Sequence, residues 1–304
     1  MTTEQQVRSK QGVLLALAAY TMWGIAPIYF KAIIEVAPLE ILSHRIIWSF
    51  VFLAFLLHLG KRWKVVAKVL KQKKSMLFLT VTSLLVATNW LIFIWAVNTE
   101  HMIDASLGYY INPLFNVLLG MVFLGERLRK LQWFAVLLAF LGVAIQIVAF
   151  GKVPVVALAL ATSFGCYGLL RKKINLDAQT GLFIETMIIL PAALIYLALI
   201  ADSSTSNLVN NELNLNLLLF AAGIVTTLPL LCFNGAATRI MLSTLGFFQY
   251  IGPSLMFLLA VFIYHEPFSA DKALTFTFIW AALIIFSFDG LKFANQNRKM
   301  RKAL

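Results

Sequence analysis

The chain has 304 residues, of which 61% are hydrophobic and only 12% are charged, and its formal net charge is +12. Soluble domains carry about 25% charged residues, so this composition excludes an ordinary soluble protein. A positive charge of this size can indicate nucleic-acid binding, but here the charges follow the sides of a membrane, and we expect no nucleic-acid partner for the basic loop 61–74.

The apolar residues form ten continuous stretches, and a helix needs about twenty such residues to cross the hydrocarbon core. The stretches cover 12–31, 39–59, 76–97, 103–124, 131–150, 153–170, 181–201, 215–235, 243–264 and 273–291. Continuous apolar runs, rather than alternating ones, exclude a membrane β-barrel. The sequence therefore predicts an all-α integral membrane protein with ten transmembrane helices.

The first stretch follows Arg8 and Lys10, which is also how a signal peptide begins. The stretch is longer than a typical signal core and nine further stretches follow it, so we interpret it as an uncleaved first span. Cys166 and Cys232 both lie inside predicted helices. We therefore expect no structural disulfide and no redox or metal role for either thiol.

Basic residues are concentrated in alternate connections between the predicted spans. With a cytoplasmic N-terminus, all 25 Lys and Arg except Lys31, Arg45, Lys152 and Lys272 fall on the cytoplasmic side, including those of the basic tail 292–304. Cytoplasmic loops of membrane proteins carry such an excess of Lys and Arg. The sequence therefore predicts that both termini are cytoplasmic.

The chain contains two similar halves. Residues 15–24 resemble residues 156–165, and Leu-Gly-Tyr-Tyr at 107–110 resembles Leu-Gly-Phe-Phe at 245–248. The matches share an offset of about 140 residues, and such a duplication of apolar helices is typical of secondary transporters. Five spans per half is an odd number, so the second half enters the membrane from the opposite side. We expect two inverted five-helix repeats, at 12–150 and 153–291.

Proline residues interrupt several predicted helices, and each removes one backbone hydrogen bond. Pro113 precedes Glu126 by thirteen residues, and Pro253 precedes Glu266 by the same interval. Because these two prolines occupy matching positions in the halves, we predict that they are hinges beside a substrate path. The remaining intrahelical prolines are interpreted as ordinary curvature: Pro27, Pro191 and Pro229.

Ser43, His44 and Arg45 place three polar residues in a row in the second predicted helix. Arg45 lies six residues into that helix, about 9 Å along its axis. We predict that His44 and Arg45 bind substrate, with Arg45 facing an anionic or carbonyl group; an intramolecular partner that fixes helix packing is an equally weighted alternative. Trp48 lies on the same side as Arg45, where it can stack on substrate or belong to the interfacial aromatic belt.

Three further predicted spans carry polar side chains. Asn89 is in the middle of the third, and Tyr109, Asn112 and Asn116 share one face of the fourth by their spacing. Gln249 and Tyr250 provide a similar polar and aromatic surface in the ninth span. These residues are predicted to line the substrate cavity, and interhelical hydrogen bonding alone is the alternative.

Glu185, in the seventh span, is the only acid that the sequence places clearly inside a predicted span. A proton-coupled carrier needs a titratable group inside the membrane, so Glu185 is the first candidate for coupling to a proton and His44 the second. The alternative for Glu185 is an ion pair with Lys172 or Lys173, which lie near the same membrane surface.

Several motifs that carry chemistry are missing from the sequence. It contains no phosphate-binding G-x-x-x-x-G-K-[ST], no H-E-x-x-H and no G-x-S-x-G, and its four His show no metal-ligand spacing. We expect no ATP hydrolysis, no metal site, no cofactor and no catalytic residue.

Taken together, the spans and the repeats resemble the drug/metabolite transporter superfamily in its EamA-type branch. Eight strings, spread over nearly the whole chain, resemble the RarD subfamily of that branch: GVLLALAAY at 12–20, WGIAP at 23–27, SHRIIW at 43–48, ASLGY at 105–109, INPL at 111–114, GER at 125–127, PLLCF at 229–233 and STLGFFQYIGP at 243–253. The resemblance implies a permease or exporter of the bacterial inner membrane. The subfamily name refers to chloramphenicol sensitivity, which points to drugs without establishing a substrate.

The expected function is secondary transport of small metabolites or drugs by alternating access, with membrane lipid and a small-molecule substrate as partners. The alternative is a non-transporting membrane scaffold or sensor, which would need neither matched breakers nor a polar cavity wall. A membrane enzyme would need paired acids or an activated nucleophile, which the sequence does not show.

Overall fold

The computed structural model describes residues 3–98, 102–151, 153–263 and 270–302. Within these ranges the chain forms helices and no strands, which confirms the predicted all-α class. Ten of the helices are long and apolar enough to cross a membrane, one for each of the ten predicted stretches.

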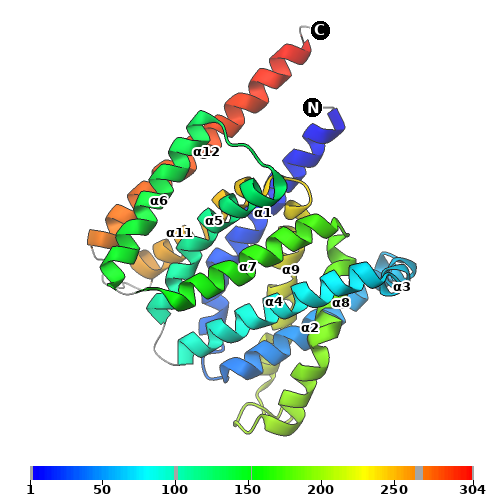
Figure 1. Ribbon diagram of the computed structural model, residues 1–304. Coiled ribbons are helices and arrows are strands. Elements are labelled where there is room, and N and C mark those ends of the chain that lie inside the picture. The colour runs from blue at the N-terminus through cyan, green and yellow to red at the C-terminus, as the bar shows by residue number, and fades with distance from the viewer. Residues whose placement is uncertain (1–2, 99–101, 152, 264–269, 303–304) are drawn as a thin grey trace.

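The first half of the chain contains five of the spanning helices and one short helix. The spanning helices are α1 (Thr3–Lys31), α2 (Pro38–Leu59), α4 (Lys73–Asn98), α5 (Met102–Leu124) and α6 (Lys130–Phe150), and the short helix is α3 (Trp63–Leu70). The ends of α1 and α12 that carry the chain termini extend on the same side of the molecule (Figure 1). An even number of crossings requires this arrangement.

The second half contains the other five spans, two of which include a π-helical turn. The elements are α7 (Val155–Ile174), α8 (Ala178–Ile195), η1 (Tyr196–Ile200), α9 (Leu213–Ala237), α10 (Leu242–Gln249), α11 (Ile251–Leu258), η2 (Leu259–Ile263) and α12 (Ala270–Lys302). The seventh span is α8 with η1, and the ninth consists of α10, α11 and η2. The predicted tail 292–304 continues α12 as helix through Lys302.

The helix ends follow local sequence signals. Asp177 caps α8 by accepting a hydrogen bond from the Thr180 amide at 3.1 Å, which satisfies one of the free N–H groups of the first turn. Gly151 ends α6 with a φ of 73°, a conformation that is available to glycine without strain. Asn175, which also tolerates the left-handed region, ends α7 with a φ of 50°.

The basic stretch 61–74 is not all loop, because residues 63–70 form α3. Val66 and Val69, three residues apart, are buried, while the lysines between the apolar positions remain exposed. Trp63 packs edge-on against Phe183 of α8 with ring centroids 5.4 Å apart. An amphipathic helix that lies on the ends of the spanning helices explains why this short segment folds.

The spanning helices pair in a pattern that relates the two halves. Numbered one to ten in chain order, span one contacts spans eight and nine, and span six contacts spans three and four in the same way. Spans two and seven, four and nine, and five and ten pack directly against each other, and Figure 1 shows the last of these pairs as α6 beside α12. These principal contacts are unchanged when each span is exchanged with the one five positions away, which is consistent with two repeats.

Five aromatic side chains pack together between α1, α7 and α9. Tyr20 and Trp23 of α1, Phe164 and Tyr167 of α7, and Phe233 of α9 lie within ring-contact distance of one another. Tyr167 and Phe233 stack with centroids 6.1 Å apart. Such rings bury large apolar areas and hold spans one, six and eight together.

Candidate functional site

Arg45 lies on α2 among groups contributed by three other helices. Its Nε donates a hydrogen bond to the Thr226 hydroxyl of α9 at 2.8 Å. The guanidinium also lies over the rings of Trp90 from α4 and Phe30 from α1, at 5.1 and 5.6 Å from the ring centroids. A planar guanidinium stacks well on aromatic faces, so these contacts orient Arg45 between four helices.

The surroundings of Arg45 do not neutralise its charge. Within the described ranges no carboxylate lies within salt-bridge distance of Arg45, and its two Nη atoms have no hydrogen-bond partner. The side chain is half-buried. Its contacts on the protein are thus a neutral hydroxyl and two rings, with the phenols of Tyr29 and Tyr109 near enough to interact electrostatically. The end of the guanidinium is left for another group.

The neighbours of Arg45 in sequence point elsewhere. His44 is buried on the side of α2 toward α8, η1 and the connection 201–212. It does not face the same side as Arg45, because adjacent residues of a helix are turned by about 100°. Trp48 packs against Phe220 of α9 with centroids 3.8 Å apart. The predicted polar cluster is therefore divided between two sides of the helix.

The contact of α2 with α9 beside Trp48 is unusually close. The Ser49 hydroxyl donates to the Gly223 carbonyl at 3.2 Å. A Cβ atom on Gly223 would overlap the backbone of Trp48 and Ser49. Only glycine allows the two backbones to approach in this way.

Asn89 serves as an interhelical link. Its Nδ2 donates to the Leu160 carbonyl at 3.0 Å and to the Ser163 hydroxyl at 2.9 Å, both on α7. Tyr109 of α5 is 37% exposed and meets Phe93 of α4 edge-on at 6.2 Å. The spacing rule placed Tyr109 with Asn112 and Asn116, but the structure shows its ring beside α4.

Three amides form a buried ladder between spans four and nine. The Nδ2 of Asn116 donates to the Asn112 Oδ1 and to the Gln249 Oε1, both at 3.1 Å, while the Asn116 Oδ1 is buried without a partner in the described part of the chain. Next to the ladder, the Tyr250 hydroxyl donates to the Tyr110 carbonyl at 3.2 Å. The structure thus joins Asn112, Asn116 and Gln249 by hydrogen bonds. The sequence left open whether these residues line a cavity or only link the helices.

The two predicted hinge prolines differ in their surroundings. Pro113 lies within the continuous helix α5. In the ninth span, by contrast, the helix is interrupted at Tyr250, between the end of α10 and the start of α11, three residues before Pro253. The adjacent Gly252 adds backbone freedom that the Asn112–Pro113 pair lacks.

Glu185 is 1% exposed and is held by three side chains. Thr82 donates a hydrogen bond to its Oε1 at 2.5 Å, Tyr167 donates to its Oε2 at 3.3 Å, and the Arg171 Nη1 lies 3.5 Å from Oε1. The ion-pair partner that we expected, Lys172 or Lys173, is wrong. Arg171, one position before Lys172, is the residue that faces Glu185. The Lys172 Nζ instead lies 3.9 Å from the Glu126 Oε1 and donates to the Ile240 carbonyl.

Two acids near the ends of spans are also buried, although the sequence places only Glu185 clearly inside a span. Glu40, in the first turn of α2, is 1% exposed, and Asp289 of α12 is 7% exposed. Asp289 pairs with Arg129 at 2.5 Å, and Glu40 accepts the Thr205 hydroxyl at 2.9 Å. Both lie near span ends, where the hydropathy of a segment does not show how deeply a side chain packs.

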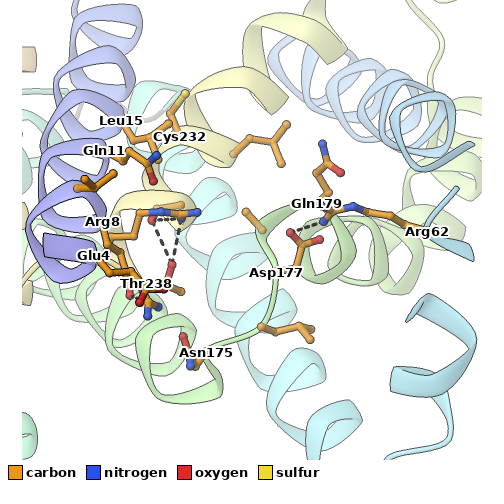
Figure 2. Close-up of a pocket in the computed structure, with 16 residues that line it drawn as sticks. Glu4, Arg8, Gln11, Leu15, Arg62, Asn175, Asp177, Gln179, Cys232 and Thr238 are labelled. Atoms are coloured by element: carbon orange, nitrogen blue, oxygen red, sulfur yellow. Dashed lines mark hydrogen bonds and ion pairs between the residues drawn. The ribbon is translucent and has the colours of Figure 1, made fainter. Parts of the chain in front are cut away.

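A cavity of about 610 Å³ opens between α1, α9 and the α7–α8 connection. Figure 2 shows Glu4, Arg8 and Gln11 of α1 on one wall, with Asp177 and Arg62 on the opposite wall. None of the predicted substrate residues lines this cavity. In the sequence, the feature that could have located this cavity is Asp177, three residues before Thr180. This spacing is an N-cap pattern that marks the start of α8.

An ion pair at this cavity joins the start of α3 to the start of α8. The Arg62 Nη1 lies 2.6 Å from the Asp177 Oδ1, with both side chains more than a third exposed. Burial alone would raise the pKa of Asp177, but hydrogen bonds from Arg62 and Thr180 outweigh it and hold the pKa below its usual value. Asp177 therefore stays ionised and keeps both helix ends in place.

The sequence predicts no metal centre, and the side chains that usually hold metal ions are those of His, Cys, Asp and Glu. Among the residues that the structure describes, no three of these lie close enough together to hold a metal ion. Cys166 and Cys232 are both free thiols. Glu266, the predicted counterpart of Glu126, lies outside the described residues.

Comparison with known proteins places these features in a family. Residues 10–148 match the EamA-like transporter family. An uncharacterized transporter of Vibrio cholerae is 67% identical over 301 residues, which cover 99% of each chain, and protein RarD of Salmonella typhi is 60% identical over 284 residues, 93% of this chain and 97% of that one. A crystal structure at 20% identity has the same fold, with a TM-score of 0.69 over 90% of this chain and 96% of that one.

Proposed function

The chain belongs to the EamA-like transporter family, in its RarD subfamily, and we propose that it is a secondary transporter of small amphipathic metabolites or drugs across the bacterial cytoplasmic membrane. The observation that carries this proposal is Arg45, which has no carboxylate partner in the described part of the chain. A cation within a span is costly unless it is paired. A group of the substrate would provide the partner that the Arg45 guanidinium lacks.

The contacts of Arg45 indicate the kind of group it would hold. Thr226 occupies Nε, and the faces of the guanidinium lie against Trp90 and Phe30. The two Nη atoms are then left to donate to a carboxylate or carbonyl oxygen. A substrate with one such oxygen and an apolar body would satisfy both Arg45 and the surrounding rings.

We further propose that residues 12–150 and 153–291 are inverted repeats that move against each other. The exchange symmetry of the helix contacts supports this arrangement. Transporters of this kind alternate between two states by rocking one repeat against the other. Pro113 and Pro253 are the candidate hinges, and the interruption at Tyr250 makes Pro253 the stronger one.

The proposed orientation has both termini in the cytoplasm. It is supported by the basic residues that lie on one side of the predicted spans and by the position of both helix ends on that side (Figure 1). The 610 Å³ cavity, with Arg8, Arg62 and Arg239 in its lining, then opens to the cytoplasm. The multi-pass chain would contact membrane lipid along its exposed apolar side chains.

Glu185 remains the candidate for coupling transport to protons. Its carboxylate is enclosed by Arg171, Thr82 and Tyr167, so a change in its protonation would alter contacts with α4 and α7 at once. The alternative is a purely structural ion pair. An imposed pH gradient applied to wild type and to Glu185→Gln separates the two, because only a coupling role makes gradient-driven accumulation depend on this carboxylate.

The deciding experiment is uptake into proteoliposomes that hold the purified protein. Labelled chloramphenicol and a panel of amino acids would be offered, each with and without a pH gradient. We expect accumulation of at least one compound. No flux of any compound into vesicles with folded protein would contradict the proposal and favour a scaffold or sensor.

Arg45→Ala in the same assay tests the proposed recognition residue. We expect transport to fall to background, because loss of a charged hydrogen bond and its stacking contacts costs about 2 kcal/mol or more, at least tenfold in affinity. Arg127→Ala is the matched control, because Arg127 is exposed. Normal transport by folded Arg45→Ala would remove Arg45 from the substrate path.

A further inference from the structure

A second cavity, of about 500 Å³, lies at the end of α2 where the chain enters that helix. It is lined by His44 of α2, by Leu194, Leu197 and Ala198 of α8 and η1, and by Ser206, Asn207 and Leu208 of the connection 201–212. Arg45 is not among the described residues that line this cavity. The cavity is an open, shallow groove whose volume is in the range of small-molecule sites.

His44 is the unusual member of this lining. Its side chain is 3% exposed, and neither ring nitrogen has a hydrogen-bond partner in the part of the chain that the structure describes. A buried polar group without a partner is unfavourable by about 1–3 kcal/mol. A ligand hydroxyl or amide would pair with one of the two nitrogens, because a neutral imidazole has one donor and one acceptor that point in different directions.

The cavity is also built in advance of any ligand. Thr205 donates to the buried Glu40 carboxylate at 2.9 Å, one helical turn before His44, and the Asn211 amide donates to the Thr205 carbonyl at 3.0 Å. These bonds fix the connection that supplies Ser206, Asn207 and Leu208. The opposite wall includes η1, and π-helical turns occur frequently at functional sites.

We propose that this cavity binds an amphipathic small molecule whose hydroxyl or amide group pairs with His44. The apolar body of the ligand would lie against Leu194, Leu197 and Leu208, and Ser206 and Asn207 would border its polar end. The ligand group would either donate to the unprotonated ring nitrogen or accept from the protonated one. The site is separate from the transport proposal, because binding here requires neither flux nor Arg45.

Photolabelling of the full chain in lipid nanodiscs tests this site, with a photoreactive octanol that carries a diazirine as the probe. We expect adducts, mapped by mass spectrometry, on the lining segments 194–198 and 206–208. Excess octan-1-ol should displace them and excess octane should not, because octane has no hydroxyl for His44. Equal competition by octane, or adducts spread over all lipid-facing helices, would overturn the proposal.

Variants at His44 give a second test. His44→Leu should reduce labelling of the lining segments about fivefold or more, the effect of one lost hydrogen bond, whereas His44→Gln should retain most of it. His58→Leu, at the exposed end of the same helix, is the matched control. Unchanged labelling in folded His44→Leu would also overturn the proposal, and if that variant does not fold, the octanol and octane comparison decides.

Discussion

Arg171 and Glu185 show how a single glycine makes room for a buried charge. Both side chains are 1% exposed, and a Cβ atom on Gly181 would overlap the Arg171 guanidinium. The three guanidinium nitrogens have no hydrogen bond in the described part of the chain. Arg171 therefore depends on the charge of Glu185 rather than on a full set of hydrogen-bond acceptors.

Arg171→Leu should lower the free energy of unfolding by about 3–5 kcal/mol, because it leaves the Glu185 carboxylate buried without its counter-ion. The double variant Arg171→Leu with Glu185→Leu should recover most of that loss, since no charge then remains buried. Thermal unfolding of the purified variants in detergent measures both effects. A double variant that is less stable than either single one would contradict this account.

Asp177 gives a pH-dependent prediction. Because its pKa is depressed in the folded protein, its contribution to stability is present above the unfolded pKa of about 3.9 and is lost as pH falls through the folded value. Asp177→Asn should lower the melting temperature at neutral pH. The corresponding loss in the free energy of unfolding should be about 0.2–1 kcal/mol, because the ion pair with Arg62 is exposed and screened by solvent.

The difference between wild type and Asp177→Asn should shrink at pH values below about 4 and at high salt. Melting curves at several pH values and two salt concentrations check this expectation. A difference that stays constant across the acid range would show that the charge of Asp177 does not contribute.

At the residue scale, the sequence predicted which polar side chains are buried better than it predicted their partners. Asn112, Asn116 and Gln249 do meet, because helical spacing places the two asparagines on one face and the halves match. The sequence could not predict that Arg171 rather than Lys172 faces Glu185. That choice depends on the rotation of α7 against α8, which tertiary packing decides.

Glu126 links the end of one helix to the start of another. Its Oε1 accepts the Leu242 amide at 2.6 Å, and its Oε2 accepts the Ser243 amide at 2.9 Å and the Ser243 hydroxyl at 2.7 Å. These amides are in the first turn of α10, where free N–H groups and the helix dipole both favour a carboxylate. Glu126 thus caps a helix in the other half of the chain.

Glu126→Ala should destabilise the protein by about 1–3 kcal/mol and speed hydrogen exchange of the Leu242 and Ser243 amides, because three hydrogen bonds are lost. Glu212→Ala is the matched control, since Glu212 stands at the N-cap of α9 without a side-chain capping bond. Exchange mass spectrometry of the α10 peptide is the readout. Unchanged exchange at α10 would contradict the capping role.

At the element scale, the ten spans were predictable because lipid requires every backbone group to be satisfied within its own helix. The interruption at Tyr250 was not predictable from proline alone, since Pro113 leaves α5 continuous. The short helix α3 was also missed. Its eight residues are fewer than an isolated helix needs, so packing of Val66 and Val69 stabilises it.

At the scale of the whole molecule, the proposed topology makes the 610 Å³ cavity reachable from the cytoplasm. Cys232 lies in its lining and provides a native reporter. In a Cys166→Ser background, a membrane-impermeant maleimide should label Cys232 in inverted vesicles several times faster than in right-side-out vesicles. Faster labelling from the outside would reverse the orientation of the chain.

The close approach at Gly223 has a consequence for mutational scans. Because a side chain there would displace the backbone of α2, substitution of Gly223 should abolish function as completely as substitution of a residue that contacts cargo. The loss would arise from separating two helices, and the protein level in the membrane would fall with it. Intolerance to substitution along α9 therefore does not by itself map the binding site, and abundance has to be scored beside activity at each position.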